Sequence, residues 1–343
     1  MRWENKVVVI TGASAGVGRA TAIEFAKGGA CLGLLARGLD GLEGARRDVE
    51  AAGGRAVVLR TDVSDPQQVE AAAARVEEHC GPIDVWVNNA MVSVFSPVME
   101  TTPEEFRRVT EVTYLGIVHG TLSALRRMQP RNHGVIVQVG SALAYRSIPL
   151  QSAYCAAKHA VKGFNDSLRC ELHHDRSKVK LTMVQLPALN TPQFSWVRSR
   201  LPRHPQPMPP IFQPEVAARA ILYAAAHHPR ELHVGWPTVQ AIVGNKVVPG
   251  LLDRYLGNTG YEAQQASFPV QRDRKDNLFN SLPGDYGAHG IFDSRARTHS
   301  RELWARTNIG WLGAVAALIA AGIGLSNQIR RDNVNRLIRD LAA

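Results

Sequence analysis

The chain has 343 residues, a hydrophobic content of 45% and a formal net charge of +10. This length fits one large domain or a domain with additions, and the apolar fraction is ordinary for a protein that buries a full core. The positive charge favours anionic partners, such as a phosphorylated ligand or an acidic membrane surface. It does not favour nucleic acid, because Lys and Arg do not cluster with interleaved aromatic residues.

The four cysteines, at positions 31, 80, 155 and 170, are scattered without CxxC spacing. This pattern predicts free thiols in a reducing compartment, not a disulfide framework or a zinc site. The histidine pairs at 173–174 and 227–228 lack ligand spacing, so we predict no metal. No apolar signal segment precedes the first strand, and we therefore expect the catalytic part to face the cytoplasm.

A glycine-rich turn follows the first predicted strand, 6–10, and leads into a predicted helix over 17–27. In the sequence TGASAGVG, Gly12 permits a tight turn, Gly16 lets the backbone approach a pyrophosphate, and Gly18 lets the helix pack against the strand. The first N–H groups of such a helix point at the phosphates. A glycine pattern alone is a weak signal, but between a strand and a helix it predicts a dinucleotide site.

The second predicted strand, 31–36, ends without the acidic residue that binds the ribose hydroxyls of NAD. Arg37 follows it, and a guanidinium suits a 2′-phosphate through bidentate hydrogen bonds. We therefore expect NADP(H) to be preferred over NAD(H). The alternative is an exposed arginine at a strand end.

Strands and helices then alternate along the chain. The further predicted strands are 55–60, 84–87, 135–139, 179–186 and 231–235, and the further helices are 39–52, 66–79, 103–129, 151–163 and 215–227. Seven parallel strands with right-handed crossovers require a doubly wound sheet. The predicted fold class is α/β, a Rossmann-like seven-stranded parallel sheet with a helical extension at the C-terminus.

Ser141, Tyr154 and Lys158 are the candidate catalytic residues. Tyr154 and Lys158 are four residues apart on a predicted helix, so their side chains share one face. An ammonium beside a phenol stabilises the phenolate, and we expect the pKa of Tyr154 to fall toward working pH. Such a tyrosine can exchange a proton with a substrate oxygen. Ser141 follows the strand 135–139 and can hold a carbonyl oxygen next to the tyrosine.

This Ser–Tyr–Lys set and the TGxxxGxG spacing from Thr11 to Gly18 resemble the classical short-chain dehydrogenase/reductase family over residues 1–250. The resemblance implies that Ser141 positions the substrate oxygen, Tyr154 exchanges the proton, and Lys158 lowers the tyrosine pKa. It also implies that Tyr154 and Lys158 contact the cofactor, with Lys158 on the nicotinamide ribose.

The resemblance further implies a set of cofactor contacts outside the glycine turn. Asp62 would accept a hydrogen bond from the adenine amino group, and the Val63 N–H would donate to the adenine. The PALNT turn would meet the nicotinamide carboxamide or a phosphate. The other implied cofactor-binding residues are Ser14, Val17, Asn88, Ala90, Pro187 and Thr191.

Three positions depart from the family's pattern. Met91 replaces the glycine of NNAG, and Ala188 replaces the glycine of PGxxxT. Thr113, which we count among the catalytic residues, stands where the family has an asparagine that holds a water in a proton path. We expect Met91 to narrow the pocket and Thr113 to retain the relay with altered geometry.

The segment 194–214 is rich in proline, arginine and aromatic residues and corresponds to the family's substrate-covering loop. Phe194, Trp196, Met208 and Phe212 could line an apolar substrate site. The alternative for each of them is an ordinary surface loop.

Beyond residue 250 the resemblance fades. Residues 251–300 are polar, and we expect a partly ordered extension or linker. Residues 307–329 carry no charge, and 309–325 are nearly all apolar, which is about the length of a transmembrane helix. A buried helix or an arm docked on a partner subunit is the alternative. The range 301–343 thus holds an apolar helix and then an amphipathic tail, 327–343, which could lie on an anionic membrane or pair with another copy.

The sequence thus predicts an NADP(H)-dependent oxidoreductase that moves hydride between nicotinamide and a carbonyl or secondary alcohol of a lipophilic small molecule. Its catalytic domain would face the cytoplasm, with membrane association through 307–329. The family's usual assembly, on helices around 104–127 and 152–172, implies a homo-oligomer. The alternatives are a cofactor-binding regulatory protein with weak turnover and a scaffold assembled through its C-terminal helix.

Overall fold

The computed structural model describes residues 3–271 and 273–308, in two compact units. The first unit is Met1–Ser300, and the second is Arg301–Ala343. Within the second unit the described element is α11 (Arg301–Thr307). The sheet, the candidate site and the other elements below all belong to the first unit.

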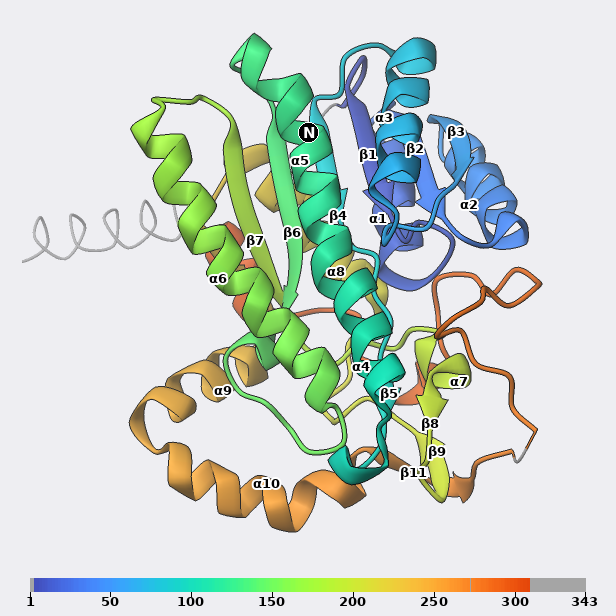
Figure 1. Ribbon diagram of the computed structural model, residues 1–343, viewed down its shortest axis with the longest axis vertical. Helices are drawn as coiled ribbons and strands as arrows, with labels where there is room; N and C mark the ends of the chain where they lie inside the picture. Colours follow the sequence, from blue (N-terminus) through green and yellow to red (C-terminus); the bar gives the residue numbers. More distant parts are fainter. Residues whose placement is uncertain (1–2, 272, 309–343) are drawn as a thin grey trace, which may run out of the picture. The chain divides into compact units, whose positions relative to one another are not determined.

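A seven-stranded sheet with every neighbouring pair parallel forms the centre of the first unit (Figure 1). In spatial order the strands are β10 (Glu231–His233), β7 (Lys180–Leu186), β6 (Val135–Ser141), β4 (Val85–Asn88), β1 (Val7–Thr11), β2 (Cys31–Ala36) and β3 (Arg55–Arg60). The predicted doubly wound parallel sheet is confirmed. Its strand order reverses between β1 and β4, which places a ligand crevice at their carboxyl ends.

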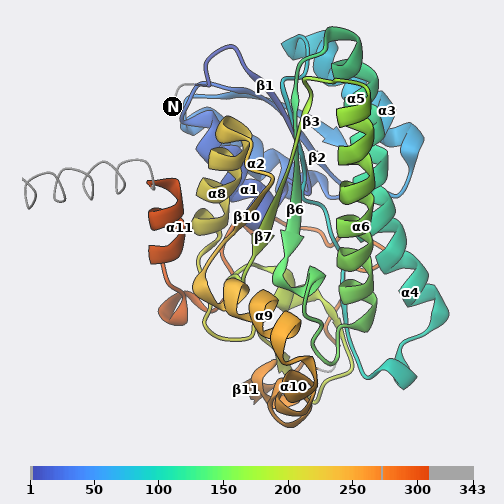
Figure 2. The same ribbon diagram turned by 90° about the vertical axis from the view of Figure 1, so that its left-hand side faces the viewer.

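Helices cover both faces of the sheet, as Figure 2 shows in edge view. One face carries α1 (Gly16–Ala26), α2 (Leu39–Ala51) and α8 (Pro214–His227), and the other carries α3 (Pro66–Cys80), α5 (Gly116–Arg131) and α6 (Ser152–His174). Because both faces are covered, every residue of β1 and β2 is buried. This explains why these strands are continuous apolar runs instead of alternating ones.

The helix predicted over 103–129 has three parts: α4 (Pro103–Thr110), a π-helical turn (Glu111–Leu115) and α5. Gly116 and Gly120 do not interrupt the helix but allow close packing. A Cβ atom at Gly120 would collide with the side chain of Asn88, and one at Gly116 with that of Val63. The π turn adds a residue to the helix next to the carboxyl end of β4, a geometry that recurs at functional sites.

Residues 251–300 differ from the expected partly ordered linker, because they pack within the first unit. After α9 (Trp236–Val247) comes α10 (Pro249–Ala263), and β11 (Gln265–Pro269) pairs antiparallel with β9 (Arg203–Pro205). Leu278 is fully buried in the main hydrophobic core. The smaller elements are β5 (Val94–Phe95) paired with β8 (Arg198–Ser199), α7 (Gln193–Trp196), and 3-10 turns at Val98–Glu100, Ala142–Ala144 and Asp293–Arg295.

The cysteine prediction is wrong for two of the four residues. Cys31 at the start of β2 and Cys80 at the end of α3 form a disulfide, with their Cα atoms 5.9 Å apart. Cys155 and Cys170 are free. Spacing could not show this pair, because 49 residues separate the two cysteines and only the fold brings them together. Cysteine usage therefore no longer supports a reducing compartment.

Among the helices of the described residues, none is both long and apolar enough to cross a membrane. The apolar segment 309–325 and the amphipathic tail, on which the membrane prediction depends, lie outside the described residues.

Candidate cofactor and catalytic site

The turn between β1 and α1 has the shape of a phosphate cradle. Gly12 and Gly16 have positive φ angles of 68° and 56°, which glycine adopts without strain. A Cβ atom at Gly12 would lie 2.9 Å from the Cα of Ala90, and one at Gly18 would overlap the carbonyl of Gly12. The residue before α1 is Ala15, which has no polar side chain to cap the first N–H groups of the helix. The N–H of Gly16 donates to the carbonyl of Gly287 at 3.1 Å, and the N–H groups that follow it suit an anion, so the turn fits the pyrophosphate of a dinucleotide.

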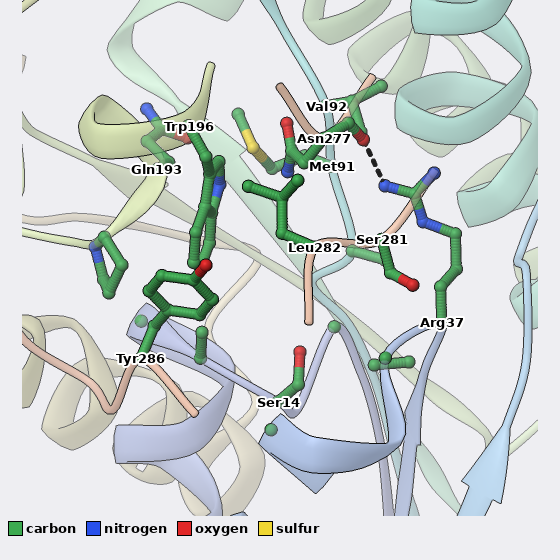
Figure 3. Close-up of a pocket in the computed structure, with 18 of the residues that line it drawn as sticks. Ser14, Arg37, Met91, Val92, Gln193, Trp196, Asn277, Ser281, Leu282 and Tyr286 are labelled. Carbon is green, nitrogen blue, oxygen red and sulfur yellow. Dashed lines mark hydrogen bonds between the residues drawn. The ribbon is translucent and has the colours of Figure 1, made fainter. Parts of the chain in front are cut away.

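A cavity of about 210 Å³ opens above this turn, at the carboxyl ends of β1, β2 and β4 (Figure 3). We call it the cofactor cleft. Met91 and Val92 line it from the segment after β4, and Trp196 lines it from α7. Of the cofactor-binding residues predicted from the sequence, those in its lining are Gly12, Ser14, Gly16, Val17, Arg37, Asp62, Val63, Ala90 and Thr191.

Asn88, which we predicted to bind cofactor, lies in the interior instead. It is fully buried, and its Nδ2 donates to Thr121 Oγ1 at 3.1 Å and to Gln138 Oε1 at 3.0 Å. Asn88 therefore holds β4 to β6 and α5. Its neighbour Asn89 lines the cleft and donates from Nδ2 to the carbonyl of Thr11 at 2.9 Å, which ties the end of β4 to β1. The other predicted cofactor-binding residues outside the cavity lining are Gly18, Pro187, Tyr154 and Lys158, and Ser141 lies outside it as well.

Asp62 already has protein partners on both carboxylate oxygens. Ser64 donates to Oδ1 from its N–H at 3.0 Å and from its hydroxyl at 2.8 Å, and Arg108 donates to Oδ2. Burial opposes ionisation, but these hydrogen bonds outweigh it and lower the pKa of Asp62. An adenine amino group would have to share this carboxylate with Arg108.

Arg37 lies at the edge of the cleft, and its guanidinium is held by backbone carbonyls from the C-terminal part of the first unit. Nη1 donates to the carbonyls of Leu278 and Phe279 at 3.3 and 3.0 Å, and Nη2 donates to the carbonyl of Asn277 (Figure 3). Burial and then the nearby Arg108 charge lower the pKa of Arg37. The hydrogen bonds of Arg37 to these three carbonyls contradict the alternative that it is an exposed arginine at a strand end.

The candidate catalytic residues come together beside the end of β6. Ser141 ends this strand, while Tyr154 and Lys158 lie one turn apart on α6. The Ser141 hydroxyl is near enough to the phenol of Tyr154 to favour its ionised form, and Ser141 Oγ accepts from the N–H of Leu143 at 3.1 Å. Lys158 is 2% exposed, its Nζ donates to the carbonyl of Val139 at 2.8 Å, and it lies 5.6 Å from the centre of the Tyr154 ring.

The expected fall in the pKa of Tyr154 is not found. Burial raises this pKa, and the nearby Ser141 hydroxyl offsets only part of the rise. Burial also lowers the pKa of Lys158 to about 8. The helical spacing correctly placed the amine near the ring, but its nitrogen is directed to the carbonyl of Val139 and both groups are desolvated.

The three departures from the family pattern have different surroundings. Thr113 is fully buried in the π turn, where its hydroxyl accepts from the N–H of Val92 at 3.0 Å and donates to the carbonyl of Val92 at 2.9 Å. It therefore fastens the π turn to the segment after β4, and its part in a proton relay stays a prediction. Met91 lies in the cleft lining, as expected. Ala188 accepts a hydrogen bond from the N–H of Phe212 at 2.9 Å.

The four residues proposed for the substrate loop lie in different surroundings, and Met208 is half-buried outside the lining of the cofactor cleft. Trp196 lines the cofactor cleft. Phe194 is buried in a core cluster with Phe95 and Phe292, and Phe212 is buried as well. Aromatic composition marked this segment as apolar, but it could not distinguish rings that face a cavity from rings that face the core.

Two parts of the cleft were not predicted. Residues 277–287 supply part of its wall, through Asn277, Ser281, Leu282, Gly284 and Tyr286, in a segment that carries no motif. Ser93 also lines the cleft, and its buried Oγ has no hydrogen-bond partner among the described residues. Its place four residues after Asn89 in a segment that leaves β4 was the available signal.

Comparisons with known proteins agree with this geometry. A sequence profile described as short chain dehydrogenase matches residues 6–201. The uncharacterized oxidoreductase YxnA of Bacillus subtilis is 31% identical over 313 residues, which cover 90% of this chain and 83% of that protein. Dehydrogenase/reductase SDR family member 7 of Homo sapiens is 40% identical over 176 residues, covering 50% of this chain and 52% of the relative.

A solved structure is similar as well. The alcohol dehydrogenase from the archaeon Thermococcus sibiricus, complexed with 5-hydroxy-NADP, superimposes with a TM-score of 0.58 at 28% sequence identity. The match covers 67% of this chain and 95% of that one.

Proposed function

The chain belongs to the short-chain dehydrogenase family, and from this premise we propose an NADP(H)-dependent enzyme that reduces a carbonyl of a lipophilic small molecule, or oxidises the corresponding secondary alcohol. The observation that carries the proposal is the grouping of Ser141 at the end of β6 with Tyr154 and the buried Lys158 on α6, where Lys158 Nζ lies 5.6 Å from the centre of the Tyr154 ring. This set lies in a fold whose glycine turn fits a dinucleotide.

A bound nicotinamide would supply or accept the hydride. Ser141 would hold the substrate oxygen, and Tyr154 would exchange a proton with it. The phenol of Tyr154 is protonated at neutral pH, as an ordinary tyrosine is, and burial raises its pKa further. The protonated phenol is the form that would donate a proton to a carbonyl oxygen.

Arg37 supports the choice of NADP(H). A guanidinium has five N–H donors, and the three carbonyl contacts described above use three of them. Two donors remain for a 2′-phosphate at the edge of the cleft. The end of β2 offers no carboxylate for the ribose hydroxyls of NAD, since Ala36 precedes Arg37.

The test is consumption of NADPH or NADH with a panel of long-chain ketones, steroid ketones and retinoid aldehydes. We expect turnover, with kcat/KM for NADPH about 10-fold or more above that for NADH, as one bidentate phosphate contact would provide. Equal use of both cofactors would contradict the preference. Cofactor binding without turnover would instead support a regulatory protein, the alternative that Met91 and Thr113 motivate.

The lipophilic substrate and the membrane association rest on the apolar segment 309–325 and on Met91, Val92 and Trp196 in the cleft. We expect the full chain to float with liposomes that contain anionic lipid. Leu318→Asp should reduce the floating fraction several-fold, because a carboxylate in the bilayer centre is strongly unfavourable. Ser326→Asp, near the end of the segment, is the matched control. Equal flotation of the Leu318 variant and the parent would contradict insertion. A homo-oligomer stays a prediction.

A further inference from the structure

Residues 277–287, which we call the strap, line one side of the cofactor cleft. The first end of the strap is fixed firmly. The side chain of Leu278 is fully buried in the main core, and the N–H of Asn277 donates to the carbonyl of Trp196 at 3.1 Å. The carbonyl of Leu278 accepts from Arg37 and also from Arg108 Nε, the latter at 3.1 Å.

The middle of the strap faces the glycine turn. Ser281 and Leu282 line the cleft opposite Ser14 (Figure 3). The ring of Tyr286 meets that of Trp196 edge-on, with the ring centres 4.6 Å apart. The strap and α7 together therefore form a wall that faces the cradle across the cavity.

The far end of the strap is held by α1 and α2. Asp285 forms an ion pair with Arg19, which is mostly buried, and its Oδ2 lies 3.5 Å from Arg47 Nη2. The carbonyl of Gly287 accepts from the N–H of Gly16 at 3.1 Å. The N–H of Gly284 donates to Asp40 Oδ2 at 2.7 Å. These contacts are polar and partly exposed, so this end is easier to release than the end rooted by Leu278.

We infer that the strap is the outer wall of the dinucleotide site and closes over the bound cofactor. The inference rests on the proposed function. The cavity lies between the glycine turn and the strap, so a dinucleotide on the cradle would be enclosed beneath residues 281–286. Entry and release require the Asp285 end to open, and the contacts of that end set the release rate for NADPH and NADH alike.

The first test compares two carboxylates that share one arginine. Asp285→Asn removes the strap's ion pair with Arg19, whereas Asp48→Asn removes the other partner of Arg19, on α2, without touching the strap. Stopped-flow nicotinamide fluorescence would give the association and dissociation rate constants of NADPH and NADH. We expect Asp285→Asn to raise dissociation about fivefold for both cofactors, and Asp48→Asn to change it less than twofold.

The second test locks the strap in place. A Cβ atom at Gly38 would lie 3.4 Å from the Cβ of Ser281, close to the separation in a disulfide. In the double variant Gly38→Cys with Ser281→Cys, and with the exposed Cys170 changed to Ser, oxidation after loading should trap NADPH through gel filtration. Oxidation before loading should prevent uptake, and dithiothreitol should reverse both effects. The Cys170→Ser parent, treated identically, controls for the Cys31–Cys80 disulfide.

The outcomes separate this inference from the proposed function. Three results would contradict the proposal that the strap closes over the cofactor. These are equal dissociation rates in the Asp285 and Asp48 variants, an effect on NADPH alone, and uptake of cofactor by the oxidised, cofactor-free double-cysteine variant. Faster association with unchanged dissociation would also overturn it, because the strap would then obstruct the site. Trapping of NADPH by a protein that reduces no ketone would sustain the strap and refute the enzyme proposal. Failure of the parent to bind either cofactor would refute both.

Discussion

Replacing Tyr154 by phenylalanine is expected to lower kcat for ketone reduction by about 1,000-fold, in the range typical of a lost general acid. The change removes one hydroxyl and keeps the ring that packs against the core. The hydroxyl of Ser141 would remain to hold the substrate oxygen, but no proton donor would be left at that position. The Kd for NADPH should stay within about threefold, since the glycine turn and Arg37 are untouched.

Tyr223→Phe is the matched control, because this tyrosine lies on α8 and stacks on His227 away from the cleft. It should keep kcat within about twofold. Steady-state kinetics with NADPH and the best ketone, together with fluorescence titration of NADPH, would measure both quantities. An unchanged kcat in the Tyr154 variant would refute the proton-transfer role and with it the proposed mechanism.

Replacing Lys158 by methionine is expected to abolish most of the activity and yet stabilise the folded protein at pH 7. The ammonium is 2% exposed and its hydrogen-bond partner is a single carbonyl, so burial lowers its pKa from 10.5 to about 8. At pH 7 both states carry the proton, and the folded state bears the full desolvation penalty. Removing the ammonium should raise the free energy of unfolding by about 1–3 kcal/mol. The upper figure corresponds to the whole pKa shift converted to free energy.

The pH dependence has a definite sign. Between about pH 8 and 10.5 the unfolded chain still holds the Lys158 proton that the folded chain has released. The unfolded state then binds more protons, so the parent gains stability as pH rises through this window. The Lys158→Met variant should lack this contribution. The free energies of unfolding of the parent and the variant should therefore become more similar as the pH rises. Urea unfolding from pH 6.5 to 9 would show the convergence.

Lys162→Met is the control for this substitution, one helical turn further along α6. Lys162 forms an ion pair with Asp166 at 2.8 Å and is much more exposed, so its loss should change stability by less than about 1 kcal/mol. It should also leave the pH dependence as in the parent. A Lys158 variant that is less stable than the parent at pH 7 would show that the buried ammonium is better solvated than these contacts indicate.

The fold was predictable because its signals are local. The apolar runs of β1 and β2 mark strands covered on both faces, and the glycine turn between β1 and α1 marks the crevice. The π turn at Glu111–Leu115 was not predictable. It depends on the tertiary contact of Thr113 with Val92, and the apolar periodicity of a helix hardly changes when one residue is inserted.

The candidate site was predictable where geometry follows from chain spacing. Tyr154 and Lys158 had to share a helix face, and Ser141 had to lie at a strand end. The direction of the shift in the Tyr154 pKa was not predictable. Sequence spacing fixes the distance between two residues along a helix, but it does not show how far their side chains are exposed to solvent. The strap was not predictable for a different reason. Its backbone carbonyls, about 240 residues further along the chain, accept hydrogen bonds from Arg37, and any amino acid can supply a carbonyl.

The backbone carbonyls that accept hydrogen bonds from Arg37 bear on any attempt to change the cofactor preference by mutation. Under the proposed function, cofactor choice would be divided between a side chain at the end of β2 and main chain from residues 277–279, which the matched profile over 6–201 does not include. Grafting a carboxylate from an NAD-using relative onto position 37 would place a negative group against three carbonyl oxygens. We expect this substitution to weaken the attachment of the strap before it changes the preference between NADPH and NADH. A successful change of cofactor would require the end of β2 and residues 277–279 to be exchanged together.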